Sequence, residues 1–163
     1  MKLQGTALLD SGSEALFFVD HNRDIIMPMV ALHGERPYAS RMKSGKVIIQ
    51  YGSLVYPHEK RVAFLLVKTG HDVTFLPVGI DKSPDILYRG KKWEIKSPTG
   101  SKRRTLENNL RAALRQSSNI IIDLARIHIP EETCLRFLKD RKARLGKRVS
   151  IIIVRQNGKI IEL

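Results

Sequence analysis

Two short isoleucine-rich runs constrain the fold of this chain more than any other feature. One covers residues 119–123 and the other covers residues 148–154, and each follows a segment with helical character. Runs this rich in β-branched residues are too apolar for exposed strands and are typical of parallel strands buried on both faces. The repeated helix-then-strand order predicts an α/β (α+β) fold, in which a mixed central sheet is flanked by helices.

The chain from residue 57 onward divides into elements at its proline, glycine and asparagine residues. Pro57 suits the first turn of a helix that Gly70 ends, and leucines at a helical period predict a second helix further on. Asn157 and Gly158 form a hairpin turn signal near the C-terminus. The expected elements are a helix at 57–69, strands at 72–77, 83–88 and 92–96, a helix at 101–116, a strand at 119–123, a helix at 130–146, and strands at 148–154 and 159–163.

The first 50 residues are the least informative part of the sequence. Segments 14–20 and 45–51 have apolar, strand-like centres, and residues 33–37 indicate a turn. We therefore expect an N-terminal extension of unknown role at residues 1–50, packed on the core, and a single domain at residues 51–163. No run approaches the roughly 18 apolar residues of a spanning helix, and no secretory signal is evident. The single cysteine, Cys134, excludes an internal disulfide, so cytoplasmic action without a membrane is expected, while the oligomeric state stays undecided.

Positive charge is concentrated in two segments. The chain has 29 Lys+Arg and 16 Asp+Glu, a net charge of +13. Residues 82–115 contribute a net +7 and residues 136–148 a net +6, so the remaining residues are balanced. Such localised charge favours a binding surface for a polyanion over general solubilisation, with an ordinary solvated surface as the alternative.

One spacing of acidic and basic residues could carry chemistry. Asp85 follows a proline, and Glu94 and Lys96 lie one residue apart in the next expected strand, so their side chains share a face. If Arg89 and Gly90 form a two-residue turn, Asp85 lies opposite Glu94. Two carboxylates and an ammonium group then converge on one patch. A bare match of this spacing is more often an exposed hairpin with ordinary surface charges, and its context decides between the two interpretations.

A divalent metal is the natural compensation for two neighbouring carboxylates. Oxygen ligands suit Mg²⁺ or Mn²⁺, and such a metal can hold both a phosphate and the water that attacks it. Lys96 would stabilise the developing negative charge or assist that water. Hydrolysis of a phosphodiester bond requires this combination of groups.

The context of this spacing resembles the PD-(D/E)xK nuclease superfamily, whose core is an α-β-β-β-α-β unit. The resemblance covers about residues 57–123 and implies a restriction-endonuclease-like core. It implies that Asp85 and Glu94 bind the catalytic metal and that Lys96 is the catalytic lysine. It also implies that Glu59, on the first helix, completes the metal site, and that Gln116, after the second helix, takes part in catalysis.

Residues 93–98 and 115–123 are similar to one branch of that superfamily, the C-terminal nuclease domains of CdiA-type contact-dependent growth inhibition toxins. This similarity implies a tRNA nuclease that acts in the cytoplasm of a target cell, and an acidic immunity-type inhibitor as a partner. A basic stripe on the helix at 101–116 would bind the nucleic-acid backbone. Arg104, Arg111 and Arg115 form the stripe, and Lys102 and Arg103 precede it, with a solvated helix face as the alternative.

Two alternatives stay open at this point. The substrate is DNA in a large share of the superfamily, in restriction, repair or mobile-element systems. A second alternative is a nucleic-acid-binding module on the same fold without catalytic activity, which the retention of Asp85, Glu94 and Lys96 disfavours. Aromatic residues make up only 6% of the chain, which favours recognition through backbone charge and shape over base stacking.

Overall fold

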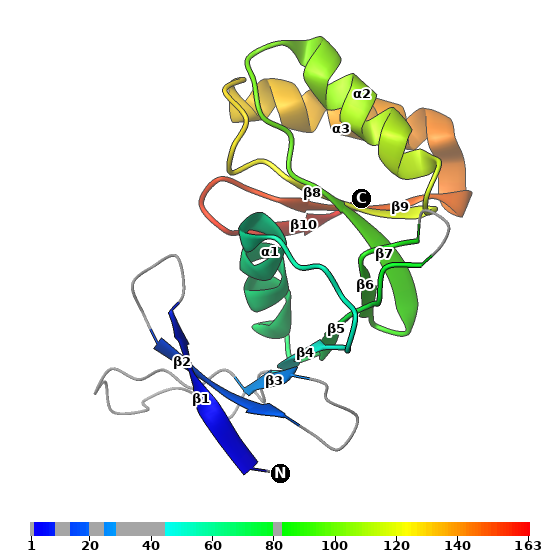
Figure 1. Cartoon of the computed structure of the whole chain (residues 1–163). Helices are drawn as coiled ribbons and strands as arrows, with labels where there is room; N and C mark the ends of the chain where they lie inside the picture. The colour runs from blue at the N-terminus through cyan, green and yellow to red at the C-terminus, as the bar shows by residue number, and fades with distance from the viewer. Residues whose placement is uncertain (1, 9–13, 20–24, 29–44, 80–82) are drawn as a thin grey trace. The chain divides into compact units, whose positions relative to one another are not determined.

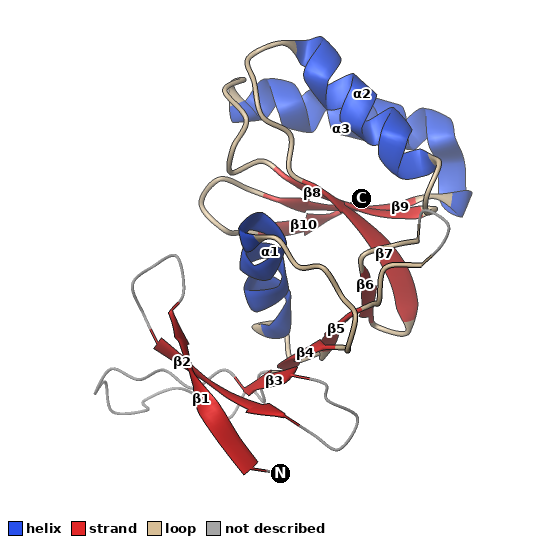
Figure 2. Ribbon diagram, in the orientation of Figure 1, coloured by secondary structure: helices blue, strands red, loops and turns tan. Residues whose placement is uncertain are grey.

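The computed structural model describes residues 2–8, 14–19, 25–28, 45–79 and 83–163 (Figures 1 and 2). The chain forms two compact units. The first contains Met1–Val78 and Leu87–Gly90, and the second contains Gly79–Ile86 and Lys91–Leu163. The short strand β6 (Ile86–Tyr88) is therefore shared between them. Each unit is described by itself below.

The first unit is built on a mixed sheet with the strand order β1-β2-β3-β4-β5. The strands are β1 (Lys2–Leu8), β2 (Glu14–Val19), β3 (Ile25–Pro28), β4 (Lys46–Ile49) and β5 (Val73–Phe75). Neighbours pair antiparallel as far as β4, and β4 pairs parallel with β5. The parallel pair requires a crossover connection, which helix α1 (Pro57–Val67) provides.

Helix α1 packs its apolar side on β4 and β5. Pro57 occupies the first turn, where a missing N–H costs nothing, and Glu59 accepts a hydrogen bond from the Tyr56 backbone N–H (3.0 Å). The buried apolar side chains of the helix meet those of the two strands. These residues are Val62, Ala63, Leu66 and Val67 of α1, Val47 of β4, and Val73 and Phe75 of β5.

The second unit contains a mixed sheet with the strand order β7-β8-β9-β10. The strands are β7 (Lys91–Lys96), β8 (Asn119–Asp123), β9 (Ser150–Val154) and β10 (Ile160–Glu162). Strands β7, β8 and β9 run parallel, and β10 returns antiparallel to β9. Successive isoleucines of β8 and β9 point to opposite faces of the sheet, and all of them are buried. Both faces of these two strands are therefore covered.

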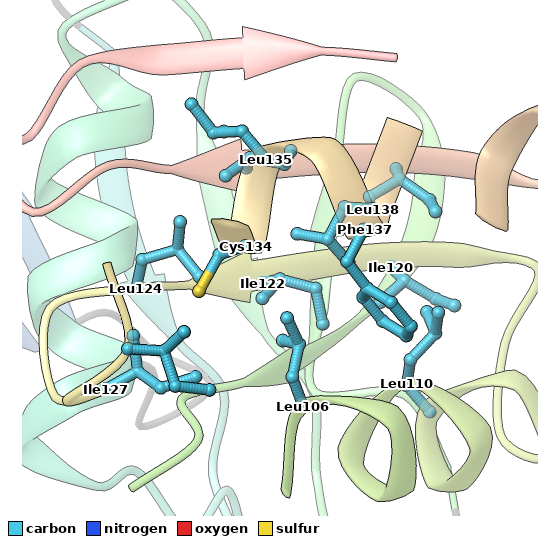
Figure 3. Close-up of a cluster of buried hydrophobic side chains, with 14 residues drawn as sticks. Leu106, Leu110, Ile120, Ile122, Leu124, Ile127, Cys134, Leu135, Phe137 and Leu138 are labelled. Atoms are coloured by element: carbon cyan, nitrogen blue, oxygen red, sulfur yellow. The ribbon is translucent and has the colours of Figure 1, made fainter. Parts of the chain in front are cut away.

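Helices α2 (Arg103–Leu114) and α3 (Glu131–Leu145) cover one face of the second sheet (Figure 1). A 3-10 turn, η1 (Gly146–Arg148), follows α3. Leu106 and Leu110 of α2 pack with Phe137 and Leu138 of α3 against Ile120 and other isoleucines of β8 and β9 (Figure 3). Cys134 lies in the same cluster, where burial raises the pKa of its thiol. It is a packing residue here.

The element order expected from residue 57 onward is confirmed, as is the fold class of a mixed sheet flanked by helices. Strand β8 has the expected bounds and α1 begins at the expected Pro57, whereas the other helix ends lie one to two residues inside the expected bounds. The strand-like segments at 14–20 and 45–51 contain β2 and β4, whereas β1 and β3 were not expected. The turn expected at 33–37 lies outside the described residues. The division of the chain at residue 50 stays a prediction.

Candidate active site

A tight turn between β6 and β7 sets which residues meet at the candidate site. Arg89 and Gly90 both have positive φ (49° and 71°), as the two central residues of a type I′ hairpin turn do. Counting back through a two-residue turn places Asp85 opposite Glu94. The backbone N–H of Ile95 donates a hydrogen bond to Asp85 Oδ2 (2.6 Å), which brings the carboxylate of Asp85 to the Glu94 end of β7.

Strand alternation determines which face of β7 carries the charged groups. Glu94 pairs with Ile120 of β8, and Lys96 pairs with Ile122. Since neighbouring residues of parallel strands point to the same face, Glu94 and Lys96 lie on the face that α2 and α3 cover. The expectation that the two side chains share one face is therefore met.

Glu94 is the most unusual residue of the site, because a carboxylate with only 1% exposure is costly to bury. Its Oε1 accepts a hydrogen bond from Lys96 Nζ in a close ion pair. Its other oxygen, Oε2, is buried and has no hydrogen-bond donor among the described residues. An acceptor in this condition needs either a proton of its own or a cation.

The pKa values of both carboxyl groups are raised. Burial raises the pKa of Asp85 most, while the Ile95 N–H and the Lys96 charge oppose that rise. Burial is also the main reason why the pKa of Glu94 is raised, and the neighbouring Asp85 charge raises it further, against the effect of Lys96. Two carboxyl groups that share one buried patch therefore resist being ionised together. This electrostatic cost is what a divalent cation would remove.

The donor set fits a hard divalent cation in part. Asp85 and Glu94 supply adjacent carboxylates, and no donor in the described part of the chain bonds Glu94 Oε2. Within the described ranges, no three His, Cys, Asp or Glu side chains form a group that could hold a metal ion. A cation held by these two residues would therefore take its remaining ligands from water and from the substrate, as Mg²⁺ commonly does.

The two remaining predicted catalytic residues lie further from this group along the chain. Glu59 is buried (7% exposed) on α1 in the first unit, with its Oε2 bonded to the Tyr56 N–H. That bond gives Glu59 a structural role at the helix start. Gln116 lies just after α2 and is half-buried, and its backbone N–H donates to Ala113 O (2.9 Å). Both catalytic assignments stay predictions.

The predicted nucleic-acid-binding residues divide into two groups. All five are exposed, with Lys102 just before α2 and Arg115 just after it. Arg103 also lies over the ring of Phe137, 5.1 Å from its centroid, and Arg141 of α3 lies over the same ring at 5.3 Å. Arg103 therefore helps to hold α2 to α3.

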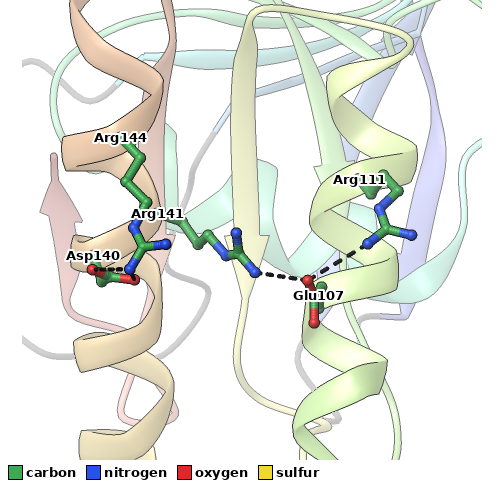
Figure 4. A network of polar contacts seen from close by, with 5 residues as sticks. All are labelled: Glu107, Arg111, Asp140, Arg141 and Arg144. Atoms are coloured by element: carbon green, nitrogen blue, oxygen red, sulfur yellow. Dashed lines mark hydrogen bonds and ion pairs between the residues drawn. The ribbon is translucent and has the colours of Figure 1, made fainter.

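Arg111 belongs to an ion-pair network between α2 and α3 (Figure 4). Its guanidinium lies 3.5 Å from Glu107, which also accepts a hydrogen bond from Arg141 (2.7 Å). The Arg111 side chain is still 66% exposed, so it can reach a ligand as well. Residues 79–86 and 91–163, which form the second unit, hold 19 Lys+Arg and 9 Asp+Glu, so this unit carries most of the net charge.

A polar group that sequence reasoning missed lies beside the site. Ser97 Oγ donates to the fully buried Asp123 (3.2 Å), and Arg126 contacts both the hydroxyl and the carbonyl of Ser97. A carboxylate at the end of an apolar strand, as in Asp123, is the one sequence signal that could have indicated it.

Comparison with known protein families matches most of the second unit. Residues 82–160 match the family model of the contact-dependent growth inhibition CdiA C-terminal domain. The match contains Asp85, Glu94 and Lys96, together with α2 and α3. A search of curated proteins finds no match.

A solved structure also shares the fold. It is a CdiA-CT/CdiI toxin and immunity complex from Burkholderia pseudomallei, with 17% sequence identity and a TM-score of 0.54. The likeness covers 71% of this chain and 97% of the other. At this level of identity it shows a common fold alone, so placement in the PD-(D/E)xK superfamily stays a prediction. Among the described helices, none is both long and apolar enough to cross a membrane.

Proposed function

We propose that this chain is a metal-dependent endonuclease that hydrolyses phosphodiester bonds of RNA, with tRNA as its substrate, in the manner of a growth-inhibition toxin domain. The observation that carries the proposal is the buried Glu94 Oε2, which has no donor in the described part of the chain and faces a second carboxylate. The family match over residues 82–160 supports a toxin domain. The net positive charge supports a polyanionic substrate.

Asp85 and Glu94 are the residues that would hold Mg²⁺ or Mn²⁺. Asp85 Oδ2 is occupied by the Ile95 N–H, so Asp85 would use its other oxygen, while Glu94 would use Oε2. When bound, the metal would supply Lewis-acid activation of the phosphate and a site for the attacking water. The remaining ligands would come from water and from the substrate, and a metal-binding role for Glu59 stays a prediction from the resemblance.

Lys96 would act on the charge that develops during the reaction. Its ammonium group bonds Glu94 Oε1, and its side chain is 23% exposed, so it is held in place and still open to a substrate. From this position Nζ would donate to a phosphate oxygen or orient the attacking water. Gln116 would contribute through its side-chain amide as a further donor.

The exposed basic side chains of α2 would hold the RNA backbone. Lys102, Arg104 and Arg115 are exposed, and Arg111 keeps two thirds of its surface accessible. Contacts of this kind position a nucleic acid without reading its sequence. The same surface would also receive an acidic immunity-type inhibitor, which is a proposal suggested by the toxin and immunity complex that shares the fold.

The test is a cleavage assay on the purified 163-residue chain with total tRNA and, separately, plasmid DNA. Each is incubated with Mg²⁺, with Mn²⁺ and with EDTA, beside the isosteric variants Asp85→Asn and Glu94→Gln. The matched control is Glu132→Gln, because the Glu132 side chain is 85% exposed and lies outside the candidate site.

We expect cleavage of tRNA that requires a divalent metal, persists in the Glu132 variant and is lost in the other two. Loss of a metal-binding carboxylate should lower the rate by about 100-fold or more. Cleavage of plasmid alone would replace RNA with DNA as the substrate. Salt-dependent binding without cleavage under any metal condition would leave a binding module and refute the catalytic role.

A further inference from the structure

A second polar cluster adjoins the candidate active site at the carboxyl ends of β7 and β8. We call it the Ser97 network, and it consists of Ser97, Asp123 and Arg126. Arg126 Nε donates to Ser97 Oγ (3.0 Å), Ser97 Oγ donates to Asp123 Oδ2 (3.2 Å), and an Arg126 Nη group donates to the Ser97 carbonyl (2.7 Å). Asp123 Oδ1 accepts a further bond from the Ala125 N–H (3.1 Å).

Donor and acceptor chemistry allows only one direction for this chain of bonds. Arginine can only donate, and an ionised aspartate can only accept. The single hydroxyl proton of Ser97 must therefore point to Asp123, while its oxygen accepts from Arg126. Asp123 is fully buried and Ser97 is 8% exposed, so this arrangement is shielded from competing water.

The network holds the residue that directly follows Lys96. Strand β7 ends at Lys96 and β8 ends at Asp123. Because Lys96 pairs with Ile122, the next residue, Ser97, lies beside Asp123. Ser97 is bonded to Arg126 through both its side chain and its carbonyl, so Arg126 holds this strand end at two points. Because the backbone on the C-terminal side of Lys96 is held in this way, the direction in which the Lys96 side chain leaves the strand is set.

We propose that the Ser97 network positions Lys96 for the reaction and that Arg126 is its key positioning residue. This inference rests on the proposed nuclease function. Arg126 is exposed and lies outside the apolar cluster of the second unit. Its double contact with Ser97 is therefore better explained by control of the strand end than by stabilisation of the core.

A direct contact between Arg126 and a substrate phosphate is the competing explanation, and two substitutions separate them. Lysine keeps the positive charge but cannot donate from two fixed directions, whereas glutamine removes the charge. If Arg126 positions Lys96, then Arg126→Lys and Arg126→Gln both lower kcat, by about 10- to 100-fold, with KM within about twofold. If Arg126 binds phosphate, Arg126→Gln raises KM, whereas Arg126→Lys leaves KM close to the wild-type value.

The experiment measures kcat and KM on total tRNA for the wild-type chain, these two variants, Ser97→Ala and the control Lys159→Gln, which removes an exposed positive charge outside both basic segments. Arg126→Ala is also assayed with added methylguanidinium. This ion should restore part of the lost kcat by donating to Ser97 in place of the missing guanidinium group. Positioning is refuted if Arg126→Gln and Ser97→Ala keep wild-type kcat. It is also refuted if the loss is confined to KM.

Amide hydrogen exchange on the same proteins tests the network without any cleavage. The backbone amides of residues 96–98 should exchange about tenfold faster in Arg126→Gln than in wild type, while those of β9 stay unchanged. Unchanged exchange at residues 96–98 would overturn the inference. An inactive wild-type chain with the expected exchange pattern would instead refute the proposed function and leave the network in place.

Discussion

Replacement of Asp85 by asparagine should stabilise the protein while it removes the proposed activity. The carboxylate of Asp85 is mostly buried next to Glu94, and burial is the main reason why its pKa is raised. A raised carboxyl pKa means that the ionised group is less favourable in the folded state than in the unfolded chain. At neutral pH the wild-type protein therefore carries an electrostatic cost that a neutral side chain lacks.

The magnitude follows from which contacts the variant keeps. Asparagine Oδ1 can still accept the hydrogen bond from the Ile95 N–H, and the ion pair between Lys96 and Glu94 does not involve Asp85. The repulsion between the two carboxylates disappears, together with the desolvation of one charge. The variant also loses the attraction between the Asp85 carboxylate and the Lys96 ammonium group, which reduces the gain in stability. We expect a net gain of about 1–2 kcal/mol in the free energy of unfolding, or roughly 2–8 °C in melting temperature.

The pH dependence provides a check on the sign. Since the folded-state pKa of Asp85 is raised, the folded protein binds this proton more tightly, and the wild-type chain recovers stability as the pH falls through that pKa. The advantage of Asp85→Asn should therefore be largest near pH 7 and vanish below the ordinary aspartate pKa of about 3.9.

Urea unfolding in metal-free buffer near pH 7 and near pH 5 measures both quantities. Asp140→Asn serves as a control, because Asp140 forms an exposed i,i+4 pair with Arg144 and should change stability by less than about 0.5 kcal/mol. An Asp85→Asn protein that is less stable than wild type near pH 7 would refute the reasoning. So would a stability difference that grows as the pH falls.

Four further outcomes are expected. Mg²⁺ or Mn²⁺ should raise the melting temperature of the wild-type chain and leave that of Asp85→Asn nearly unchanged, as a thermal scan with and without EDTA would show. Arg103→Gln should lose about 0.5–1 kcal/mol of stability through its contact with an aromatic ring, whereas Arg104→Gln should weaken tRNA binding and flatten its salt dependence. Gly90→Ala should cost about 1 kcal/mol in urea unfolding, because its φ is +71°. The pKa of Glu131 is lowered, chiefly by the Gln156 N–H, so the difference in stability between wild type and Glu131→Gln should be full near pH 7, begin to shrink below the ordinary glutamate pKa of about 4.3, and be lost as the pH falls through the lower folded-state pKa.

Much of the candidate site could be predicted from local patterns. The Asp85, Glu94 and Lys96 group follows from strand alternation and from a two-residue turn at Arg89 and Gly90, both of which depend on neighbours close in the sequence. Counting residues through such a turn is reliable because the backbone geometry of a hairpin leaves little freedom.

The states of individual side chains could not be predicted in the same way. Nothing in the sequence shows that Glu94 has only 1% exposure or that one of its oxygens lacks a donor. Arg103 and Phe137 are 34 positions apart, and they meet only because α2 and α3 pack side by side. Nothing in the sequence distinguishes Arg103, which lies over this ring, from its neighbour Arg104.

The sequence by itself determined the order of helices and strands from residue 57 onward and the convergence of two carboxylates and a lysine. These features arise from the 3.6- and 2-residue periods, from turn residues and from short chain distances. Only the tertiary structure decided which charged groups are buried, which arginines are held by Phe137 and Glu107, and that Asp123 is linked through Ser97 to Arg126. Burial and long-range hydrogen bonds depend on which segments pack together, and no local pattern contains that information.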